Sequence, residues 1–289
     1  MDRPLIVEVA INGPVLKDRN PHVPLSSDEM AASAEACLAA GATIVHAHAG
    51  VPFVGKVERH ASQPYIDAFG PVLRRHPRAI LYPTLPAGPY LPIAERFAHM
   101  AELADAGILR MAAIDPGTMN WGSFSPDGSG DEDLIYQNTF ADIRYAFDFC
   151  TRRRLGCTMS IFEPGFLQIV LAHARHGTLP PGSVVKLEFS GGHLVFGLAA
   201  NAAGLDAYLS MLDGTLLPWV VNYRDGDFSD GFGRVVLERG GHVRVGIEDY
   251  GGPGQPSNED LVAGIVELGR SLGRRPATPE ETVAILRLP

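Results

Sequence analysis

Short apolar runs alternate with amphipathic segments along the whole chain. The runs contain mainly β-branched and aliphatic residues, which favour strands, and they carry apolar residues at successive positions. Strands with this composition fit a parallel sheet that is covered on both faces. Eight such strands are predicted, at Leu5–Ile11, Thr43–His48, Ala79–Thr84, Leu109–Ile114, Thr158–Phe162, Val184–Phe189, Leu217–Asn222 and His242–Ile247.

Helices are predicted most clearly at four places, where apolar residues recur every three to four positions. Ser26 or Ser27 can cap the first of them and Gly41 can end it. The second has acidic residues in its first turn and arginines in its last turn, as the helix dipole favours. The four segments are Ser27–Ala40, Asp131–Arg153, Asn258–Leu272 and Pro279–Leu286.

The β-strand and α-helix patterns continue from start to finish without a linker, a low-complexity tract or a change in composition. Eight consecutive βα units predict an α/β protein with a single (β/α)₈ TIM-barrel domain over residues 1–289. A doubly wound open sheet is the alternative. In a barrel of this kind the active site lies at the carboxyl ends of the strands, so the residues at those ends are the first candidates for chemistry.

Composition narrows the classes of function. The 289 residues are 46% hydrophobic and 20% charged, which is typical of a globular protein with a large core. With 24 Lys and Arg against 33 Asp and Glu, the net charge of −9 predicts no nucleic-acid partner and no membrane partner. The three cysteines, Cys37, Cys150 and Cys157, have no spacing typical of disulfide or zinc-thiolate frameworks. Because no signal-like or membrane-spanning run is found, we expect a cytoplasmic protein.

Two histidines near the end of the second predicted strand are the clearest chemical feature. Side chains alternate along a strand, so His46 and His48 point to the same side and can share one cation. Strands two and eight both flank strand one in a closed barrel, which brings Glu248 within reach as a third ligand. Two imidazoles and one carboxylate fit catalytic Zn²⁺, and non-haem Fe²⁺ also uses this set. The alternative is a pair of hydrogen-bonded core histidines.

The residues around Glu248 offer a general base. Arg244 and Asp249 can form a dyad in which the guanidinium keeps the carboxylate ionised while the carboxylate removes a proton. An ordinary ion pair at the barrel mouth is the alternative. Thr84, Asp115 and Glu163 also lie at predicted strand ends, where they can either contact a substrate or simply cap the next helix.

Together these segments resemble the β-keto acid cleavage enzymes, a family of zinc-dependent (β/α)₈ barrels typified by 3-keto-5-aminohexanoate cleavage enzyme. The resemblance covers nearly the whole chain. It is carried by five segments: His46–His48, Gly117–Gly122, Phe162–Gly165, Gly241–Asp249 and Ala277–Glu281.

The resemblance implies a role for each matching residue. His46, His48 and Glu248 would hold zinc, Arg244 and Asp249 would be the catalytic dyad, and Thr84 would contact the substrate. The implied reaction is an exchange in which a β-keto acid and acetyl-CoA give acetoacetate and a new acyl-CoA. The family also implies a homo-oligomer, usually a tetramer.

The chain departs from the family where the substrate's far end would lie. Val15 stands in place of the acidic residue that binds a substrate ammonium group, and Ser160 stands in place of a second glutamate. Asn12 can hydrogen-bond a hydroxyl or a carbonyl group but cannot neutralise a cation, and Thr84 and Ser160 can likewise satisfy neutral polar groups. We therefore expect a β-keto acid whose distal end is apolar, neutral or anionic, unless Asp115, Glu163 or Asp225 takes over the ammonium site.

Two further departures concern the co-substrate. Gly50 stands where many members have an arginine, and Tyr223–Asp227 lacks the glycine-rich, aromatic-bearing sequence usual after the seventh strand. Two other functions therefore remain open beside CoA-dependent cleavage. One is a metal-dependent aldolase or hydrolase reaction without CoA, and the other is a barrel that keeps its metal only for structure or sensing.

Overall fold

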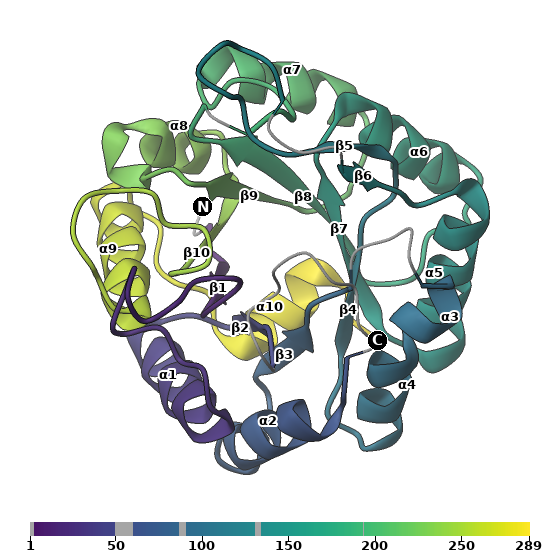
Figure 1. Cartoon of the computed structure of the whole chain (residues 1–289), viewed down its shortest axis with the longest axis vertical. Helices are drawn as coiled ribbons and strands as arrows, with labels where there is room; N and C mark the ends of the chain where they lie inside the picture. Colours follow the sequence, from purple (N-terminus) through teal and green to yellow (C-terminus); the bar gives the residue numbers. More distant parts are fainter. Residues whose placement is uncertain (1–2, 50–59, 87–90, 131–133, 193) are drawn as a thin grey trace.

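The computed structural model describes residues 3–49, 60–86, 91–130, 134–192 and 194–289. Its eight-stranded parallel sheet curls until the end strands β3 and β4 contact each other (Figure 1), so the chain is a (β/α)₈ barrel and not an open doubly wound sheet. Around the sheet the strand order is β3-β2-β1-β10-β9-β8-β7-β4. The strands are β1 (Val7–Ala10), β2 (Ile44–Ala47), β3 (Ile80–Pro83), β4 (Met111–Ile114), β7 (Gly156–Ile161), β8 (Ser183–Ser190), β9 (Trp219–Arg224) and β10 (His242–Val245).

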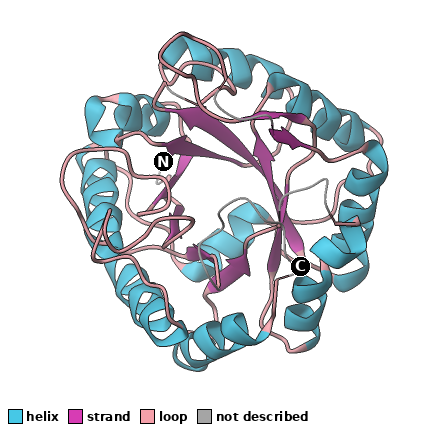
Figure 2. Ribbon diagram, in the orientation of Figure 1, coloured by secondary structure: helices cyan, strands magenta, loops and turns pink. Residues whose placement is uncertain are grey.

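Helices surround the sheet on its outside, as Figure 2 shows. One helix, α10, instead covers the amino-terminal end of the barrel, where Thr282 Oγ1 donates a hydrogen bond of 2.8 Å to Thr43 Oγ1 just before β2. The helices are α1 (Ser27–Ala40), α2 (Gln63–Arg75), α3 (Ile93–Arg96), α4 (Ala98–Asp105), α5 (Phe140–Arg153), α6 (Pro164–Arg175), α7 (Ala202–Leu212), α8 (Phe232–Glu238), α9 (Asn258–Ser271) and α10 (Pro279–Leu286), with a short 3₁₀ turn at Phe228–Asp230.

Each of the eight predicted strands overlaps an observed strand, and three of the four predicted helices begin at the predicted residue. The remaining predicted helix, Asp131–Arg153, was wrong in its first part. Leu134–Tyr136 forms β6, which pairs antiparallel with β5 (Met119–Trp121), and the helix begins at Phe140. A capping box between Thr139 and Asp142 fixes that start, because each satisfies a backbone N–H of the other. The predicted start at Asp131 lies outside the described residues.

Charged side chains fill part of the barrel interior. In the strand ladders Arg244 of β10 lies between Glu8 of β1 and Asn222 of β9, and Lys186 and Glu188 of β8 follow on the same side. All five residues are buried. Side chains alternate along a strand, so the buried Leu187 and Phe189 of β8 lie on the opposite face, where Phe189 contacts Tyr208 of α7 and Phe232 of α8. The interior therefore carries a polar layer directly beneath the carboxyl ends of the strands.

Asn258, at the first turn of α9, ties the helix to two strand ends. Its Oδ1 accepts a hydrogen bond from the Ile247 amide (2.9 Å), and its Nδ2 donates to the Ile11 carbonyl (2.8 Å). The residue is 1% exposed, so these backbone groups have no access to bulk water. The helix thereby fixes the turn that follows β10.

We predict that Asn258→Ala lowers the free energy of unfolding by roughly 2–4 kcal/mol, since it leaves a buried N–H and a buried carbonyl unsatisfied. Chemical denaturation followed by circular dichroism measures the change. Asn120→Ala, at an exposed position of β5, is the matched control and should have little effect. Equal stability of the two variants would contradict the prediction.

Candidate active site and metal centre

Three potential metal ligands converge at the carboxyl ends of β2 and β10. His46 Nε2 lies 3.5 Å from Glu248 Oε2, and His48 Nε2 lies 3.4 Å from Glu248 Oε1. The three ligand atoms are all within 4.8 Å of one another. Because β1 lies between β2 and β10 in the sheet, the two outer strands project these side chains over its end. The structure thus brings together the three residues that the sequence proposed as ligands.

The electrostatics of this cluster suit a divalent cation. Burial lowers the pKa of His46 well below its usual value, so its imidazole is neutral. Burial opposes ionisation of Glu248, but Arg244 and the two histidines overcome this and hold its pKa well below the usual value. Neutral imidazole and ionised carboxylate are the forms that bind metal. Among the described residues Glu248 Oε2 has no hydrogen-bond partner, which is unfavourable for a buried carboxylate oxygen unless a cation binds there.

Two glycines allow the close approach of the β1 loop to the ligand. Gly246 has φ +136°, and a Cβ at this residue would collide with the Ala10 carbonyl. Gly13 has φ +55°, and a Cβ there would overlap the side chain of Glu248. Since an L side chain rarely adopts either conformation, both positions require glycine. The turn after β10 and the loop after β1 therefore hold Glu248 from both sides.

Asn12, for which a substrate contact stays a prediction, binds backbone groups through its side chain. Its Oδ1 accepts a hydrogen bond from the His48 amide (2.8 Å), and its Nδ2 donates to the His48 carbonyl (2.7 Å). The same side chain also accepts from the Gly13 amide and donates to the Pro24 carbonyl. Asn12 thus continues the β1–β2 ladder by one rung beyond the strands and fixes the backbone of a potential metal ligand.

The predicted dyad is also assembled. Arg244 Nε donates to Asp249 Oδ2 at 2.7 Å, and Arg244 Nη2 lies 2.9 Å from Glu248 Oε1. Burial opposes the charge on Arg244, but Asp249 and Glu248 raise its pKa well above the usual value. The guanidinium therefore stays charged and holds ligand and base side by side. The second oxygen of Asp249 accepts from Asn222 Nδ2 at 3.2 Å.

A deeper network supports this pair from below. Arg244 Nη1 lies 3.5 Å from Glu8 Oε1, which also accepts hydrogen bonds from Lys186 (2.9 Å) and Tyr82. Burial opposes ionisation of Glu8, but Lys186 and Arg244 bring its pKa below the usual value. Glu8 lies inside β1, below the strand ends, and therefore supports the dyad without being part of the site.

Sequence reasoning did not single out four buried or half-buried residues of this network: Lys186, Glu188, Asn222 and Arg224. Asn222 and Arg224 lie near Asp249, and Lys186 contacts Glu8 below the site. Arg224 Nε donates to Glu188 Oε2 (3.2 Å), and Asn222 Nδ2 donates to the same oxygen (2.8 Å). One signal was available. Lys186 and Glu188 are charged residues two positions apart in an otherwise apolar strand, a spacing that places both on one face of the sheet.

The other predicted residues lie at or near strand ends and make structural contacts. Asp115 follows β4 and accepts a hydrogen bond from Tyr136, while Glu163 precedes α6 and accepts from the Gly197 amide at 3.1 Å. Ser160 is buried in β7, opposite Lys186 in the ladder. The carbonyl of Thr84, just after β3, lies 2.9 Å from His99 Nε2. A substrate contact for each of them stays a prediction, and Gly50 lies outside the described residues.

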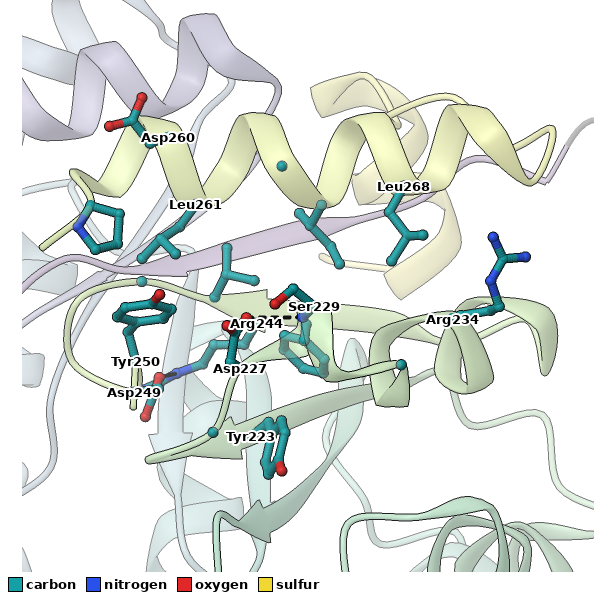
Figure 3. Close-up of a pocket in the computed structure, with 18 residues that line it drawn as sticks. Tyr223, Asp227, Ser229, Arg234, Arg244, Asp249, Tyr250, Asp260, Leu261 and Leu268 are labelled. Carbon is teal, nitrogen blue, oxygen red and sulfur yellow. Dashed lines mark hydrogen bonds and ion pairs between the residues drawn. The ribbon is translucent and has the colours of Figure 1, made fainter. Parts of the chain in front are cut away.

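Two cavities meet the site from different sides. The larger, about 540 Å³, lies between α9 and the segments after β9 and β10. Figure 3 shows Leu261 and Leu268 of α9 on one wall, Tyr223, Asp227 and Ser229 on the opposite side, and Arg244 directed at Asp249. The smaller cavity, about 370 Å³, reaches Glu248 and is lined by Val15, Trp121 and Arg224 among others.

The fold and these side chains define a barrel with a two-histidine, one-carboxylate site and a carboxylate–arginine dyad at the carboxyl ends of its strands. The family model of the β-keto acid cleavage enzymes matches residues 4–288, and the chain belongs to this family.

Two curated relatives and one solved structure show how far the similarity extends. The 3-keto-5-aminohexanoate cleavage enzyme of Fusobacterium nucleatum is 30% identical over 98% of both chains. The 3-oxoadipate:acetyl-CoA acetyltransferase of Cupriavidus necator is 27% identical over 100% of this chain and 96% of its own length. The structure of ObcA in complex with a C4-CoA adduct and oxalate covers 93% of this chain and 68% of its own, with a TM-score of 0.67 at 17% identity, and supports the fold. In the described part of the chain no helix is long and apolar enough to cross a membrane.

We predict that Asn12→Asp weakens divalent-metal binding by roughly 10–100-fold, the range typical for groups that orient metal ligands. The substitution replaces a donor with an anionic oxygen opposite the His48 carbonyl. Competition with a chelating dye measures the affinity. Asn20→Asp changes a buried asparagine of the same loop that bonds Pro256 and His22, away from His48, and should bind metal normally. The double variant His46→Ala/His48→Ala provides the reference for lost binding, and an Asn12→Asp protein that binds like the unsubstituted one would refute the prediction.

Proposed function

We propose that this protein is a zinc-dependent β-keto acid cleavage enzyme that uses acetyl-CoA. In the reaction, R–CO–CH₂–COO⁻ and acetyl-CoA give R–CO–SCoA and acetoacetate, so the acyl group and the acetyl group exchange partners. The observation that carries the proposal is the contact between the ligand cluster and the dyad. Glu248 is adjacent to Asp249 in sequence, and Arg244 contacts both carboxylates.

Zinc is the metal we propose for His46, His48 and Glu248. Two neutral imidazoles and one carboxylate are a set that catalytic zinc sites use, with a further position left for substrate. When bound, the ion would polarise the keto oxygen and stabilise the negative charge that develops after loss of the α-proton.

Asp249 is the proposed general base. Arg244 orients its carboxylate through the 2.7 Å bond from Nε, and Asn222 holds the other oxygen. The carboxylate removes a proton from the carbon between the keto and carboxyl groups. The resulting carbanion attacks the thioester carbon of acetyl-CoA, CoA passes to the former keto carbon, and the carbon–carbon bond of the original acid breaks. Asp249 then returns the proton, and no oxidant or reductant is needed.

The two cavities suit two substrates. The smaller cavity ends at Glu248 and is proposed for the β-keto acid, while the larger ends at Asp249 and is proposed for the thioester arm of acetyl-CoA. Tyr223, Gly226 and Asp227, from the segment in which this chain departs from the family, line the larger cavity. The name of the Cupriavidus necator relative includes acetyl-CoA, which supports the same co-substrate here.

The substrate's distal end is proposed to be apolar, neutral or anionic. Val15 and Arg224 both line the smaller cavity, so an ammonium group there would meet an apolar side chain and a second cation. The candidate acidic residues each have a partner, although Asp225 lines the same cavity, as does the exposed Asp18. Asp225 pairs with Arg19 at 3.2 Å, Asp115 accepts from Tyr136, and Glu163 accepts from the Gly197 amide.

Metal analysis of the purified protein, joined to a screen of β-keto acids with acetyl-CoA, tests the proposed function. Formation of acetoacetate that depends on both acetyl-CoA and metal supports it. Metal-dependent turnover without CoA would replace it by an aldolase or hydrolase reaction. Stoichiometric metal without any turnover would replace it by a structural or sensing role.

We predict that Asp249→Asn retains metal while turnover falls by roughly 10²–10⁴-fold, as expected for loss of a positioned base. Glu248→Ala should instead lose metal, because one of three ligands is removed. Elemental analysis and initial rates measured on both variants separate the two roles. The opposite pattern would mean that ligand and base have been exchanged.

We also predict that a 5-amino-3-oxo acid is turned over much more slowly than a 3-oxo acid of equal length that lacks the ammonium group. The reason is that an unpaired charge in a closed cavity is disfavoured by several kcal/mol. Comparing kcat/KM for 5-amino-3-oxohexanoate and 3-oxohexanoate gives the result. A preference for 5-amino-3-oxohexanoate would show that another carboxylate of the protein binds the ammonium group.

A further inference from the structure

Arg224 places a second guanidinium in the smaller cavity, beside the metal ligands and the base. The residue is the last of β9, and its Nε donates to the fully buried Glu188 at 3.2 Å. Its guanidinium carbon also lies 5.9 Å from the ring centre of Trp121 and 5.8 Å from that of Phe162. An ion pair and two aromatic rings thus hold the group in one position.

Most of the hydrogen-bonding capacity of this guanidinium is unused. Nη1 lies 3.6 Å from Asp249 Oδ1 and 3.8 Å from Glu248 Oε1, distances that are longer than a hydrogen bond. Among the described residues, neither terminal nitrogen of Arg224 has a hydrogen-bond acceptor in range. The residue nevertheless lines a cavity that also reaches Glu248. A planar fork of donors therefore faces the space where the proposed substrate would lie.

The charge balance shows what this fork would attract. Three carboxylates, Glu188, Glu248 and Asp249, surround the two guanidiniums of Arg224 and Arg244. A divalent cation bound at the ligand cluster would leave this group with one excess positive charge. Of the other charged residues that line the smaller cavity, Asp225 pairs with Arg19 and Asp18 is exposed to water. The buried excess charge would therefore favour binding of an anion. The pKa of Arg224 is raised by Glu188 and Asp249 against the effect of burial, so the group remains cationic.

We propose that Arg224 is the carboxylate-binding residue of the keto-acid cavity and so a determinant of substrate specificity. This inference rests on the proposed function. A guanidinium can bind a carboxylate through two parallel hydrogen bonds, which a single ammonium group cannot do. The carboxylate is either the one next to the reacting carbon, which every β-keto acid carries, or a distal one in a dicarboxylic acid. Val15 and Trp121 line the same cavity and provide apolar contacts for the carbon chain.

The test measures binding of two six-carbon acids to the metal-loaded protein without acetyl-CoA. The acids are 3-oxohexanoate and 3-oxoadipate, which differ in the distal carboxylate, and titration calorimetry gives both dissociation constants. The test variant is Glu188→Gln/Arg224→Met, in which a buried pair of charges is removed together so that neither partner is left alone. Its matched control is Glu188→Gln alone. Arg239→Met, an exposed arginine paired with Asp206, controls for loss of a positive charge elsewhere.

We expect the double variant to bind at least one acid roughly 10–100-fold more weakly than Glu188→Gln does, the effect of losing hydrogen bonds to a charged group. Equal weakening for both acids assigns Arg224 to the carboxylate next to the reacting carbon. Weakening of 3-oxoadipate alone assigns it to the distal carboxylate. Unchanged dissociation constants for both acids would overturn the proposal.

A further variant separates loss of the two hydrogen bonds from a folding defect. Arg224→Lys keeps a cation opposite Glu188 but loses the fork, and weaker binding of the same acid is expected, by a smaller factor than in the double variant. Binding equal to that of the unsubstituted protein would overturn the two-bond contact.

If neither acid binds the unsubstituted protein, the proposed function fails together with this subsite. If both acids bind and turn over without any dependence on Arg224, only the subsite fails.

Discussion

Arg244 is surrounded by three carboxylates, Glu8, Glu248 and Asp249, in the interior of the barrel. Taking these charges out of water is strongly unfavourable, and only their mutual attraction with good hydrogen-bond geometry makes the arrangement stable. Removal of the guanidinium would leave a potential metal ligand and a potential base as neighbouring buried anions without their shared partner. The rest of the site depends on this single side chain, because it lowers the pKa of Glu248 and orients both carboxylates.

The barrel topology explains why the arrangement is centred on β1. This strand is hydrogen-bonded to β2, which carries the histidines, and to β10, which carries Arg244 and leads into Glu248. The loop after β1 then supplies Asn12, which holds the backbone of His48, and Gly13, which leaves room for Glu248. Strand pairing thus brings the ligands into proximity, while short side-chain contacts beyond the strand ends determine their exact orientation. A substitution in the β1 loop would therefore change the geometry of the potential ligands even where it leaves all three unchanged.

Sequence patterns were sufficient to predict the order of elements and the ligand cluster. The alternation of His46 and His48 on one strand and the neighbourhood of strands one, two and eight follow from periodicity and closure alone. The hairpin of β5 and β6 was not predicted, because a loop of this length carries too few periodic positions to distinguish a helix start from a short strand. Arg224 and Glu188 were also missed. Their pairing depends on the register between β8 and β9, and no pattern within either strand specifies that register.

The same charges that hold the site together restrict what it can bind. Glu8 and Lys186 balance each other beneath the site, so the balance near the cavity is set by Arg224, Arg244 and the carboxylates that contact them. In the proposed function, a divalent ion would shift this balance from negative to positive and so would favour binding of an acid. Metal binding and recognition of the proposed keto acid would then be coupled through electrostatics, without any movement of the backbone. An ammonium group on the substrate would cancel part of that attraction, and Val15 provides no carboxylate to restore it.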